Sequence, residues 1–481
     1  MDIKTKIIAT IGPACDNAET LKAMLDAGVN AFRLNMSHGD DATKKELYSL
    51  VQALKLPDGQ RPCILTDLSG PKIRITDVLP NFSLNVGQTI NITNENDADE
   101  HHIRVTSDIG FKDVIEGGQI LINDGRIKLK VIDLVSTQTL KCETIIGGKI
   151  EPNKGVNFPG ITLDAPPLTD QDKLDLRIAL EMGSDWIALS FVRSAKDLDS
   201  VLAIMDEVGV RIPVMAKIEK WEALKNIDDI TKAFDAIMVA RGDLGVEIPA
   251  EQVPLAQKQI TEVATTLGKP VVIATQMLES MVSSQTPTRA EVSDIANSIF
   301  DGVDAILVTG ETAVGKYPVE VISTLTRVIQ QTEKANSVQQ LPIRNEVSKT
   351  ADAISRAVYE ITHDLDIHVV MTMTHSGSTA RMIARYRPLS KIYALTPFGH
   401  IMRQLQLVWG VTPIRVDTYE NMEMVPDRCK EVIEKYHLVP KVLNLLLQEV
   451  FQWGCRALQT MYPFIHFRIS SYTLTPISKR K

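Results

Sequence analysis

The sequence predicts an α/β protein built on a closed (β/α)8 TIM barrel, with an all-β segment inserted into the barrel and a C-terminal α/β domain. Eight short apolar runs rich in β-branched residues recur along the chain, and each is followed by a stretch with helical periodicity. The runs occupy residues 5–13, 31–37, 62–68, 186–192, 213–219, 235–243, 270–276 and 304–311. Such continuous apolar character is typical of a parallel sheet that is buried on both faces. Any single run is compatible with an ordinary loop start, and two doubly wound sheets are the alternative, but eight runs together favour the barrel.

The length and composition indicate a multidomain protein. A chain of 481 residues exceeds what one ordinary core accommodates, so two or three domains are expected. With 44% hydrophobic and 23% charged residues the composition is that of a soluble globular protein. The net charge of -8 argues against a nucleic-acid surface. We therefore expect small molecules and sister subunits as partners.

The cysteines and the N-terminus indicate a cytoplasmic location. Five scattered cysteines, none in CxxC spacing, indicate a reducing compartment rather than a disulfide framework or a zinc site. The start of the chain lacks the h-region of a signal peptide, and no run approaches the length of a membrane span. No membrane partner is expected.

The gap between the third and fourth runs is too long for a connection within a barrel. Residues 71–163 hold short alternating segments separated by Gly and Asn-Asp turns, which predicts an all-β insertion. Over the ends of the barrel strands this insertion would form a lid that excludes water. We therefore assign residues 1–70 and 164–341 to the barrel and residues 71–163 to the lid.

A second α/β pattern begins at about residue 342. The segments ADAISRAVYEITHDLD and STARMIARY have helical periodicity, whereas IHVVMTMT and KIYALTP are typical of strands. This alternation predicts a separate C-terminal domain over residues 342–481.

Charged side chains follow the predicted barrel strands at the end where barrel active sites form. Lys217 and Glu219 lie two residues apart on one strand, so both point to the same face, and Asp243 follows the next strand. Two carboxylates beside open positions suit Mg²⁺ or Mn²⁺. A structural Lys-Glu ion pair with a capping aspartate is the alternative.

Further strand ends add cations, amides and hydroxyls. The residues concerned are Arg33, Asn35, Ser37, Arg74, Thr275, Thr309 and Glu311. Guanidinium groups match phosphoryl oxygens bidentately, and phosphoryl transfer needs mostly positioning and charge neutralisation. The sequence contains no P-loop and no GxGxxG motif, so a nucleotide would be bound in another way.

Long stretches of the chain resemble the pyruvate kinase family, in that family's order. They are TKIIATIGP, RLNMSHG, GPKIR, NKGVNFPG, AKIE, ARGDLGVE, ATQMLESM, PTRAEVSD and DGVDAILVTGETAVGKYP. The resemblance covers roughly residues 1–440. It implies a phosphotransferase that moves the phosphoryl group of phosphoenolpyruvate to ADP, giving pyruvate and ATP in the last step of glycolysis. It also implies a barrel, a β lid and an effector domain, an Mg²⁺ or Mn²⁺ cofactor, and a homotetramer if the C-terminal tail permits one.

The resemblance implies catalytic roles for four barrel residues. Lys217 would be the cation on the phosphoryl group in transit, Glu219 and Asp243 the metal ligands, and Arg33 a phosphate ligand.

The resemblance also implies a pocket for the substrate carboxylate and a nucleotide side. Ala240, Arg241 and Gly242 would shape the pocket with their backbone, next to Asp243. Thr275 would bind the carboxylate beside the enolate carbon; because its hydroxyl is a poor acid, a water relay is the expected proton donor. On the nucleotide side the residues implied are Arg74, Lys154 and Asp124.

The segment ILTDLSGPKIR departs from the K⁺-requiring branch of the family. Asn35, Ser37 and Asp67 resemble ligands of a monovalent cation, completed in that branch by a threonine where this chain has Leu68. That branch continues with Gly-Pro-Glu, whereas this chain has Lys72 after Gly-Pro. Because an ammonium supplies the positive charge itself, we expect Lys72 to replace K⁺. A solvated lysine beside an intact K⁺ site is the alternative.

The segment TMTHSGSTARM resembles the family's sugar-phosphate effector loop. Hydroxyl and free N–H groups ahead of a helix suit an anion, and those here belong to Thr372, Thr374, Ser376, Gly377, Ser378 and Thr379. N-capping by Ser378 or Thr379 is compatible with either role. A sugar phosphate or a nucleotide is the effector class implied.

The resemblance stops abruptly at about residue 441. The codons permitted for residues 442–460 can spell a Gly-rich, family-like ending in the frame one nucleotide earlier, so we infer a frameshift. A purposeful divergent tail is the alternative. A shifted tail would remove closing strands and half of the effector pocket, while the candidate catalytic groups lie before residue 320.

Two other functions stay open on sequence grounds. A barrel lyase or aldolase acting on the enolate of pyruvate would share the metal carboxylates, but it needs neither a lid nor ADP. The other possibility is a non-catalytic protein that misassembles because of its altered tail.

Overall fold

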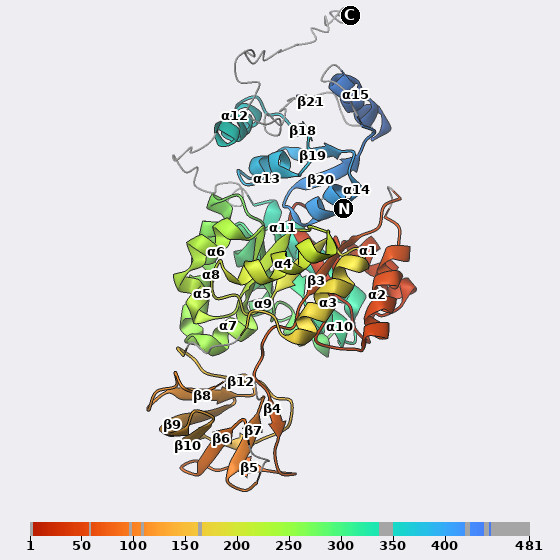
Figure 1. The fold of residues 1–481 in the computed structure, drawn as a ribbon. Helices are drawn as coiled ribbons and strands as arrows, with labels where there is room; N and C mark the ends of the chain where they lie inside the picture. Colours follow the sequence, from red (N-terminus) through yellow and green to blue (C-terminus); the bar gives the residue numbers. More distant parts are fainter. Residues whose placement is uncertain are drawn as a thin grey trace, which may run out of the picture.

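The computed structural model describes residues 3–56, 59–95, 99–106, 110–161, 166–335, 350–418, 424–436 and 442–443. Within these ranges no helix has both the length and the apolar character needed to cross a membrane. The lid sheet and the C-terminal domain lie at opposite ends of a central barrel (Figure 1).

Eight parallel strands close into a barrel in the order β1-β17-β16-β15-β14-β13-β3-β2. They are β1 (Lys6–Thr10), β2 (Ala31–Asn35), β3 (Cys63–Asp67), β13 (Trp186–Leu189), β14 (Val214–Ile218), β15 (Ala236–Ala240), β16 (Val271–Ala274) and β17 (Ala305–Val308). Each strand lies within one of the eight apolar runs of the sequence, so the predicted fold class is confirmed.

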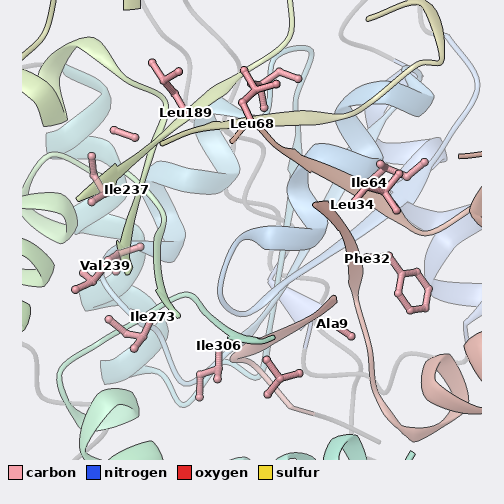
Figure 2. Close-up of a cluster of buried hydrophobic side chains, with 14 of the residues drawn as sticks. Ala9, Phe32, Leu34, Ile64, Leu68, Leu189, Ile237, Val239, Ile273 and Ile306 are labelled. Carbon is pink, nitrogen blue, oxygen red and sulfur yellow. The ribbon is translucent and has the colours of Figure 1, made fainter. Parts of the chain in front are cut away.

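Alternate residues of each barrel strand face two different apolar clusters, as a strand period of two requires. Ile237 and Val239 point outward and pack with residues of the surrounding helices (Figure 2). Ala236 and Met238 belong to a second cluster inside the barrel. Because both faces are buried, these strands show the continuous apolar character seen in the sequence.

Helices follow the barrel strands. They are α1 (Ala18–Ala27), α2 (Asp41–Ala53), α3 (Asp170–Glu181), α4 (Asp197–Val208), α5 (Trp221–Lys225), α6 (Ile227–Ala233), α7 (Arg241–Glu247), α8 (Val253–Thr266), α9 (Arg289–Phe300), α10 (Gly310–Ala313) and α11 (Pro318–Glu333). Capping boxes start two of them: Thr169 with Asp172 on α3, and Thr288 with Glu291 on α9.

The inserted segment forms its own β structure between β3 and α3. A seven-stranded sheet has the order β12-β8-β9-β10-β6-β7-β4, and β11 pairs with β5. The strands are β4 (Ile75–Asp77), β5 (Ser83–Leu84), β6 (Thr89–Thr93), β7 (His102–Val105), β8 (Gln119–Ile122), β9 (Ile127–Ser136), β10 (Thr139–Ile146), β11 (Gly148–Lys149) and β12 (Val156–Asn157). Phe111, Leu140 and Phe158 lie in a core separate from that of the barrel.

The C-terminal domain is a parallel sheet of order β20-β19-β18-β21 with accompanying helices. The elements are α12 (Thr350–Asp364), β18 (Val369–Met373), α13 (Ser378–Ala384), β19 (Lys391–Thr396), α14 (Gly399–Gln404), β20 (Val411–Arg415), α15 (Val425–Lys435) and β21 (Val442–Leu443). The predicted α/β alternation is confirmed.

The C-terminal domain is packed against the end of the barrel at which the strands begin. Leu407 is fully buried and joins the apolar cluster inside the barrel. The indole N–H of Trp186 donates to the carbonyl of Gln404 (3.2 Å), and Arg387 pairs with Asp304 (3.0 Å). The opposite end of the barrel, where the strands finish, faces the lid (Figure 1).

Candidate active site

Asp67 is the charged centre of the barrel mouth. It ends β3 and lies beside Asn35 in the β2–β3 register. Its Oδ2 accepts from Arg33 Nε (2.7 Å), and its Oδ1 accepts from Lys217 Nζ (3.0 Å). Burial by itself would raise the pKa of this carboxyl, but Lys217 and Arg33 outweigh burial and hold the pKa below its ordinary value. Asp67 is therefore an anion that holds two cations toward the barrel axis.

Lys217 is buried and held by three groups. Its ammonium donates to Ser190 Oγ (2.7 Å) and Asp67, and it lies 3.0 Å from Glu219 Oε1. Burial disfavours the charged form, but the carboxylates of Asp67 and Glu219 prevail and raise the pKa of Lys217. Lys217 is thus a fixed cation at the mouth of the barrel.

A strained turn after β13 positions both Lys217 and Glu219. Phe191 adopts a left-handed φ of 56°, and its N–H donates to Glu219 Oε2 (2.8 Å). Ser190 donates its hydroxyl to the Leu68 carbonyl (2.6 Å), which leaves an oxygen lone pair for Lys217. Strain of this kind persists where surrounding contacts enforce it and is common at functional sites.

Glu219 and Asp243 fit a divalent cation. Burial raises the pKa of Glu219, and the nearby negative charge of Asp243 raises it further against the opposing effect of Lys217. Two carboxylates that repel each other at neighbouring strand ends supply the hard oxygen atoms that Mg²⁺ and Mn²⁺ prefer. A divalent ion would relieve this repulsion.

Asp243 also forms an ion pair with a lysine that is distant in the sequence, Lys72. Lys72 Nζ lies 2.7 Å from Asp243 Oδ1, and the side chains are 25% and 26% exposed. Lys72 was expected to supply the positive charge of K⁺, and the structure brings its ammonium to the carboxylate of a candidate metal ligand.

The candidate monovalent-cation residues are only partly brought together. Asn35 Oδ1 accepts from the Ser37 N–H (3.3 Å), while Asp67 is bound to Arg33 and Lys217. The side chain of Leu68 is fully buried in the outer apolar cluster of the barrel (Figure 2). This position offers no side-chain oxygen.

The segment after β16 carries a second strained turn. Thr275 has φ 72°, and its Oγ1 accepts from the Gly242 N–H (2.8 Å). A Cβ on Gly242 would lie 3.3 Å from that oxygen, so glycine permits the close approach. The guanidinium of Arg241 pairs with Asp294 (2.6 Å) and donates to the Thr275 carbonyl (2.8 Å). The turn at Thr275 is therefore held against the backbone of Gly242, and the Arg241 side chain braces it.

The candidate nucleotide residues belong to the lid. Arg74 forms a bridge to Gly155 and donates to the carbonyl of Asn153 (2.9 Å). Lys154 lies 3.7 Å from Glu151, and Asp124 occupies a turn with φ 55°. These residues lie on the lid rather than on the barrel mouth.

The candidate effector loop precedes α13. Thr372 and Thr374 are buried, and Thr374 Oγ1 accepts from the Gly377 N–H (2.9 Å). Gly377, with φ 78°, is the N-cap of α13, so neither Ser378 nor Thr379 caps the helix.

Sequence reasoning missed several residues that the structure brings into the site. Ser190 and Phe191 follow an apolar strand that was recognised, but a single Ser-Phe pair at its end carries no distinctive signal. Thr10 Oγ1 accepts from Arg33 Nη1 (3.1 Å). Glu311 was noted at a strand end, but its buried carboxylate accepts from the N–H groups of Leu278 and Thr309, so it supports a loop.

Two protein-family models together match most of the chain. Residues 3–322 match "Pyruvate kinase, barrel domain", and residues 352–446 match "Pyruvate kinase, alpha/beta domain". The chain belongs to the pyruvate kinase family. The second match ends near the point where the resemblance was expected to stop; the tail from residue 444 lies outside the described residues.

Individual pyruvate kinases agree with this assignment. Pyruvate kinase 2 of Synechocystis is 43% identical over 421 residues, 86% of this chain and 71% of the relative. A pyruvate kinase of Agrobacterium vitis is 43% identical over 427 residues, 87% of this chain and 88% of the relative. The crystal structure of a pyruvate kinase from Cryptosporidium parvum is 33% identical with a TM-score of 0.85, covering 91% of this chain and 92% of that one.

Membership of the pyruvate kinase family decides against the lyase or aldolase. The alternative of a misassembled product concerns the tail, which from residue 444 lies outside the described residues. The enzyme is a glycolytic transferase that converts phosphoenolpyruvate and ADP to pyruvate and ATP, not a lyase or aldolase. The family also implies a divalent metal cofactor.

Proposed function

We propose that Lys217 is the catalytic cation of this pyruvate kinase and that it accompanies the phosphoryl group from phosphoenolpyruvate to ADP. The observation that carries the proposal is the buried ammonium of Lys217, fixed between Asp67, Ser190 and Glu219 at the barrel mouth. A pre-positioned charge stabilises a transition state without reorganisation. Arg33, aligned by Asp67 and Thr10, holds phosphoryl oxygens beside it.

Glu219 and Asp243 are the proposed ligands of Mg²⁺ or Mn²⁺. When bound there, the ion supplies charge neutralisation for the phosphoryl and substrate oxygens. The Phe191 N–H and Lys217 orient Glu219 and oppose the rise of its pKa on burial.

The substrate carboxylate is proposed to bind against the backbone of Ala240, Arg241 and Gly242 and the hydroxyl of Thr275. Because Thr275 Oγ1 already accepts from Gly242, its own proton remains available to donate. The enolate carbon of the product gains its proton from water, since a threonine hydroxyl is too weak an acid to give one up.

K⁺ independence is proposed from Leu68 and Lys72. The buried Leu68 side chain removes an oxygen from the candidate K⁺ ligand set of Asn35, Ser37 and Asp67, and Lys72 adds a positive charge beside Asp243. An ammonium in the site replaces the charge that K⁺ would bring.

The remaining assignments concern the lid, the effector loop and assembly. We propose that residues 71–163 close over the barrel mouth and that Arg74 and Lys154 approach the nucleotide from the lid. On family grounds we propose that a sugar phosphate or nucleotide binds at the loop containing Thr372, Thr374 and Ser376. A homotetramer and a cytoplasmic location are proposed on the same grounds.

The test is ATP formation from phosphoenolpyruvate and ADP with Mg²⁺, in K⁺-free buffer and with added KCl. We expect full activity without K⁺, and a loss of at least about 10³-fold for Lys217→Met. The double variant Leu68→Thr with Lys72→Glu should gain activity on adding KCl. Activity that needs K⁺ in the wild type would contradict the role of Lys72, and an active Lys217→Met variant would contradict that of Lys217.

A further inference from the structure

Lys72 connects the lid hinge to a candidate metal ligand. It lies between β3 and β4, on the segment that leaves the barrel for the lid, and its ammonium is 2.7 Å from Asp243 Oδ1. Asp243 lies on α7, which directly follows β15. The pair thus joins residues from the hinge and from the barrel mouth.

The two lysines of the site differ in how firmly they are held. Lys217 has a side chain 11% exposed and donates to Ser190 as well as contacting two carboxylates. Lys72 is 25% exposed, and among the described residues its hydrogen-bond partner is Asp243. Lys217 is therefore a fixed part of the site, whereas Lys72 can exchange its partner at modest cost.

Space for such an exchange lies next to Lys72. A solvent-open cavity between the hinge and the barrel is lined by Lys72, Ile73, Asn157, Phe158, Phe191 and Lys220, among others. The Lys72 stem also runs past the returning hinge segment, where a Cβ on Gly155 would lie 3.1 Å from its Cε. A shift of Lys72 is therefore possible without displacing barrel residues, and it changes contacts on the lid hinge.

An ammonium and a divalent cation on one carboxylate repel each other. Lys72 neutralises part of the negative charge of Asp243. While Lys72 remains there, the electrostatic attraction between Asp243 and a metal ion is therefore weaker. Phosphoenolpyruvate carries carboxylate and phosphate charges, which offer Lys72 an alternative anionic partner.

We propose that Lys72 competes with the divalent cation for Asp243 and that the anionic substrate releases Lys72, so that substrate and metal binding are coupled through this side chain. The inference rests on the proposed assignment of Glu219 and Asp243 as metal ligands. Linkage makes the coupling reciprocal: the factor by which substrate tightens metal binding equals the factor by which metal tightens substrate binding.

The test measures Mn²⁺ binding itself, by electron paramagnetic resonance of free Mn²⁺, with and without saturating phosphoenolpyruvate and without ADP. Lys72→Met should bind Mn²⁺ about tenfold more tightly than wild type when substrate is absent. The factor by which phosphoenolpyruvate tightens Mn²⁺ binding should fall by about the same amount. Lys72→Arg, which keeps the charge, should resemble the wild type.

Lys220→Met is the matched control. Lys220 and Lys72 each lie 5.9 Å from the centre of the Phe191 ring, but Lys220 pairs with Glu247 (2.7 Å) rather than with Asp243. If the loss of any positive charge near the site were enough to tighten Mn²⁺ binding, both variants would bind Mn²⁺ equally more tightly than the wild type. That result would overturn the competition. Unchanged or weaker Mn²⁺ binding by Lys72→Met would also overturn it.

Two further variants separate this inference from the proposed metal site. Glu219→Gln and Asp243→Asn should each weaken Mn²⁺ binding. If neither does, the proposed ligands are wrong. If both do and Lys72→Met leaves Mn²⁺ affinity and its coupling to phosphoenolpyruvate unchanged, the metal site stands and the competition alone is refuted.

Discussion

Asp67 shows how one buried carboxylate organises the site at the scale of single residues. It is 1% exposed and holds Arg33 and Lys217 in fixed positions. A buried charge with two hydrogen-bonded partners avoids most of the desolvation penalty. Removing its charge takes away the carboxylate partner of Arg33 and one of the two carboxylates that contact Lys217. Asp67 thus contributes to stability as well as to geometry.

The first prediction concerns pH. The pKa of Asp67 is lower in the folded protein than its ordinary value, so the stabilisation is present above the unfolded pKa of about 3.9 and is lost as pH falls through the folded pKa. We expect the melting temperature of Asp67→Asn to lie below that of the wild type near neutral pH and the gap to shrink below about pH 4. Thermal melts across the acid range measure the gap. A gap that stays constant with pH would contradict the pKa assignment.

The Lys72–Asp243 pair illustrates what the sequence does not show at this scale. Lys72 was identified as a functional cation because its residue type departs from a family branch. Its partner was not predicted, because 171 positions separate the two residues and their approach depends on barrel closure and the path of the hinge. Ser190 was missed for a different reason, since a lone serine after a buried strand usually has no functional role.

At the scale of elements, the turn around Gly70 supports the site from behind. Gly70 has φ 71°, and a Cβ there would lie 2.7 Å from Phe191 Cδ2 and 2.8 Å from Ser190 Cβ. Glycine is required here both for the left-handed backbone and for the close approach. Its neighbours are the residues that orient Lys217 and Glu219.

The second prediction follows from this contact. Gly70→Ala should destabilise the protein by about 3 kcal/mol, because conformational strain and a clash add. It should also lower kcat by displacing Ser190 and Phe191. Gly209→Ala is the control: Gly209 has φ 76° but open space around it, so only the strain, about 1 kcal/mol, is expected. Urea unfolding and steady-state kinetics give both quantities, and equal effects of the two substitutions would disprove the clash.

Helix α7 contacts the lid hinge through both of its halves. Asp243 near its start pairs with Lys72, and Glu247 at its end accepts from Asn157 Nδ2 (3.2 Å) on β12. Burial raises the pKa of Glu247 despite the opposing effect of Lys220. One short helix thus contacts both crossings between the barrel and the lid.

The third prediction concerns this second contact. Asn157→Ala removes the hydrogen bond to Glu247, and we expect amide hydrogen exchange around residues 155–158 to become about fivefold faster, the effect of losing about 1 kcal/mol. Exchange measured by mass spectrometry reports the change. Asn91→Ala, which removes a hydrogen bond to His102 within the lid, should leave the hinge unaffected. Equal exchange in both variants and the wild type would show that Asn157 does not restrain the hinge.

The barrel strands were predictable because their burial on both faces leaves a direct trace in the sequence. Short elements were not: α7 and α10 were seen only as polar motifs at strand ends, and their helical form depends on the loops around them. Nothing in the sequence indicates that α7 contacts both hinge segments, since Asn157 belongs to the inserted sheet.

At the scale of the whole molecule, the seam between the barrel and the C-terminal domain is a buried polar network. Asp304 accepts from Arg387 and from the Trp409 N–H (3.0 Å), and Arg387 also donates to the Gly302 carbonyl (2.5 Å). Arg387 is only 3% exposed. Breaking such a network by removing one partner is costly, because the other charge stays buried.

The fourth prediction tests the seam. Arg387→Met should lower stability by about 3 kcal/mol and separate the unfolding of the C-terminal domain from that of the barrel in calorimetry. Activity at low temperature should change little, because the proposed catalytic residues lie at the end of the barrel that faces the lid, away from the C-terminal domain (Figure 1). Arg356→Met, which removes an exposed ion pair with Glu360, should cost less than about 0.5 kcal/mol. A single transition at the wild-type temperature would contradict the role of Arg387.

The arrangement of three units was predicted from changes in sequence pattern, but the seam was not. Each unit has its own alternation of strands and helices, which is visible in the sequence. The partners across units are not, because Arg387 and Asp304 are ordinary charged residues until the two units are packed together.

The position of the lid in the sequence means that the lid leaves the ribosome before the barrel can close. Strand β3 ends at Asp67, and its neighbour in the barrel, β13, begins at Trp186. The whole lid is therefore synthesised before β3 can find that neighbour. The lid has its own core, and the bridge between Arg74 and Gly155 brings its two ends together. A lid that folds first shortens the loop that must close, which lowers the entropic cost of joining β13 to β3. A chain with a lid slow to fold would leave the edge of β3 exposed for longer, and nascent barrels would then be most prone to aggregate at this stage.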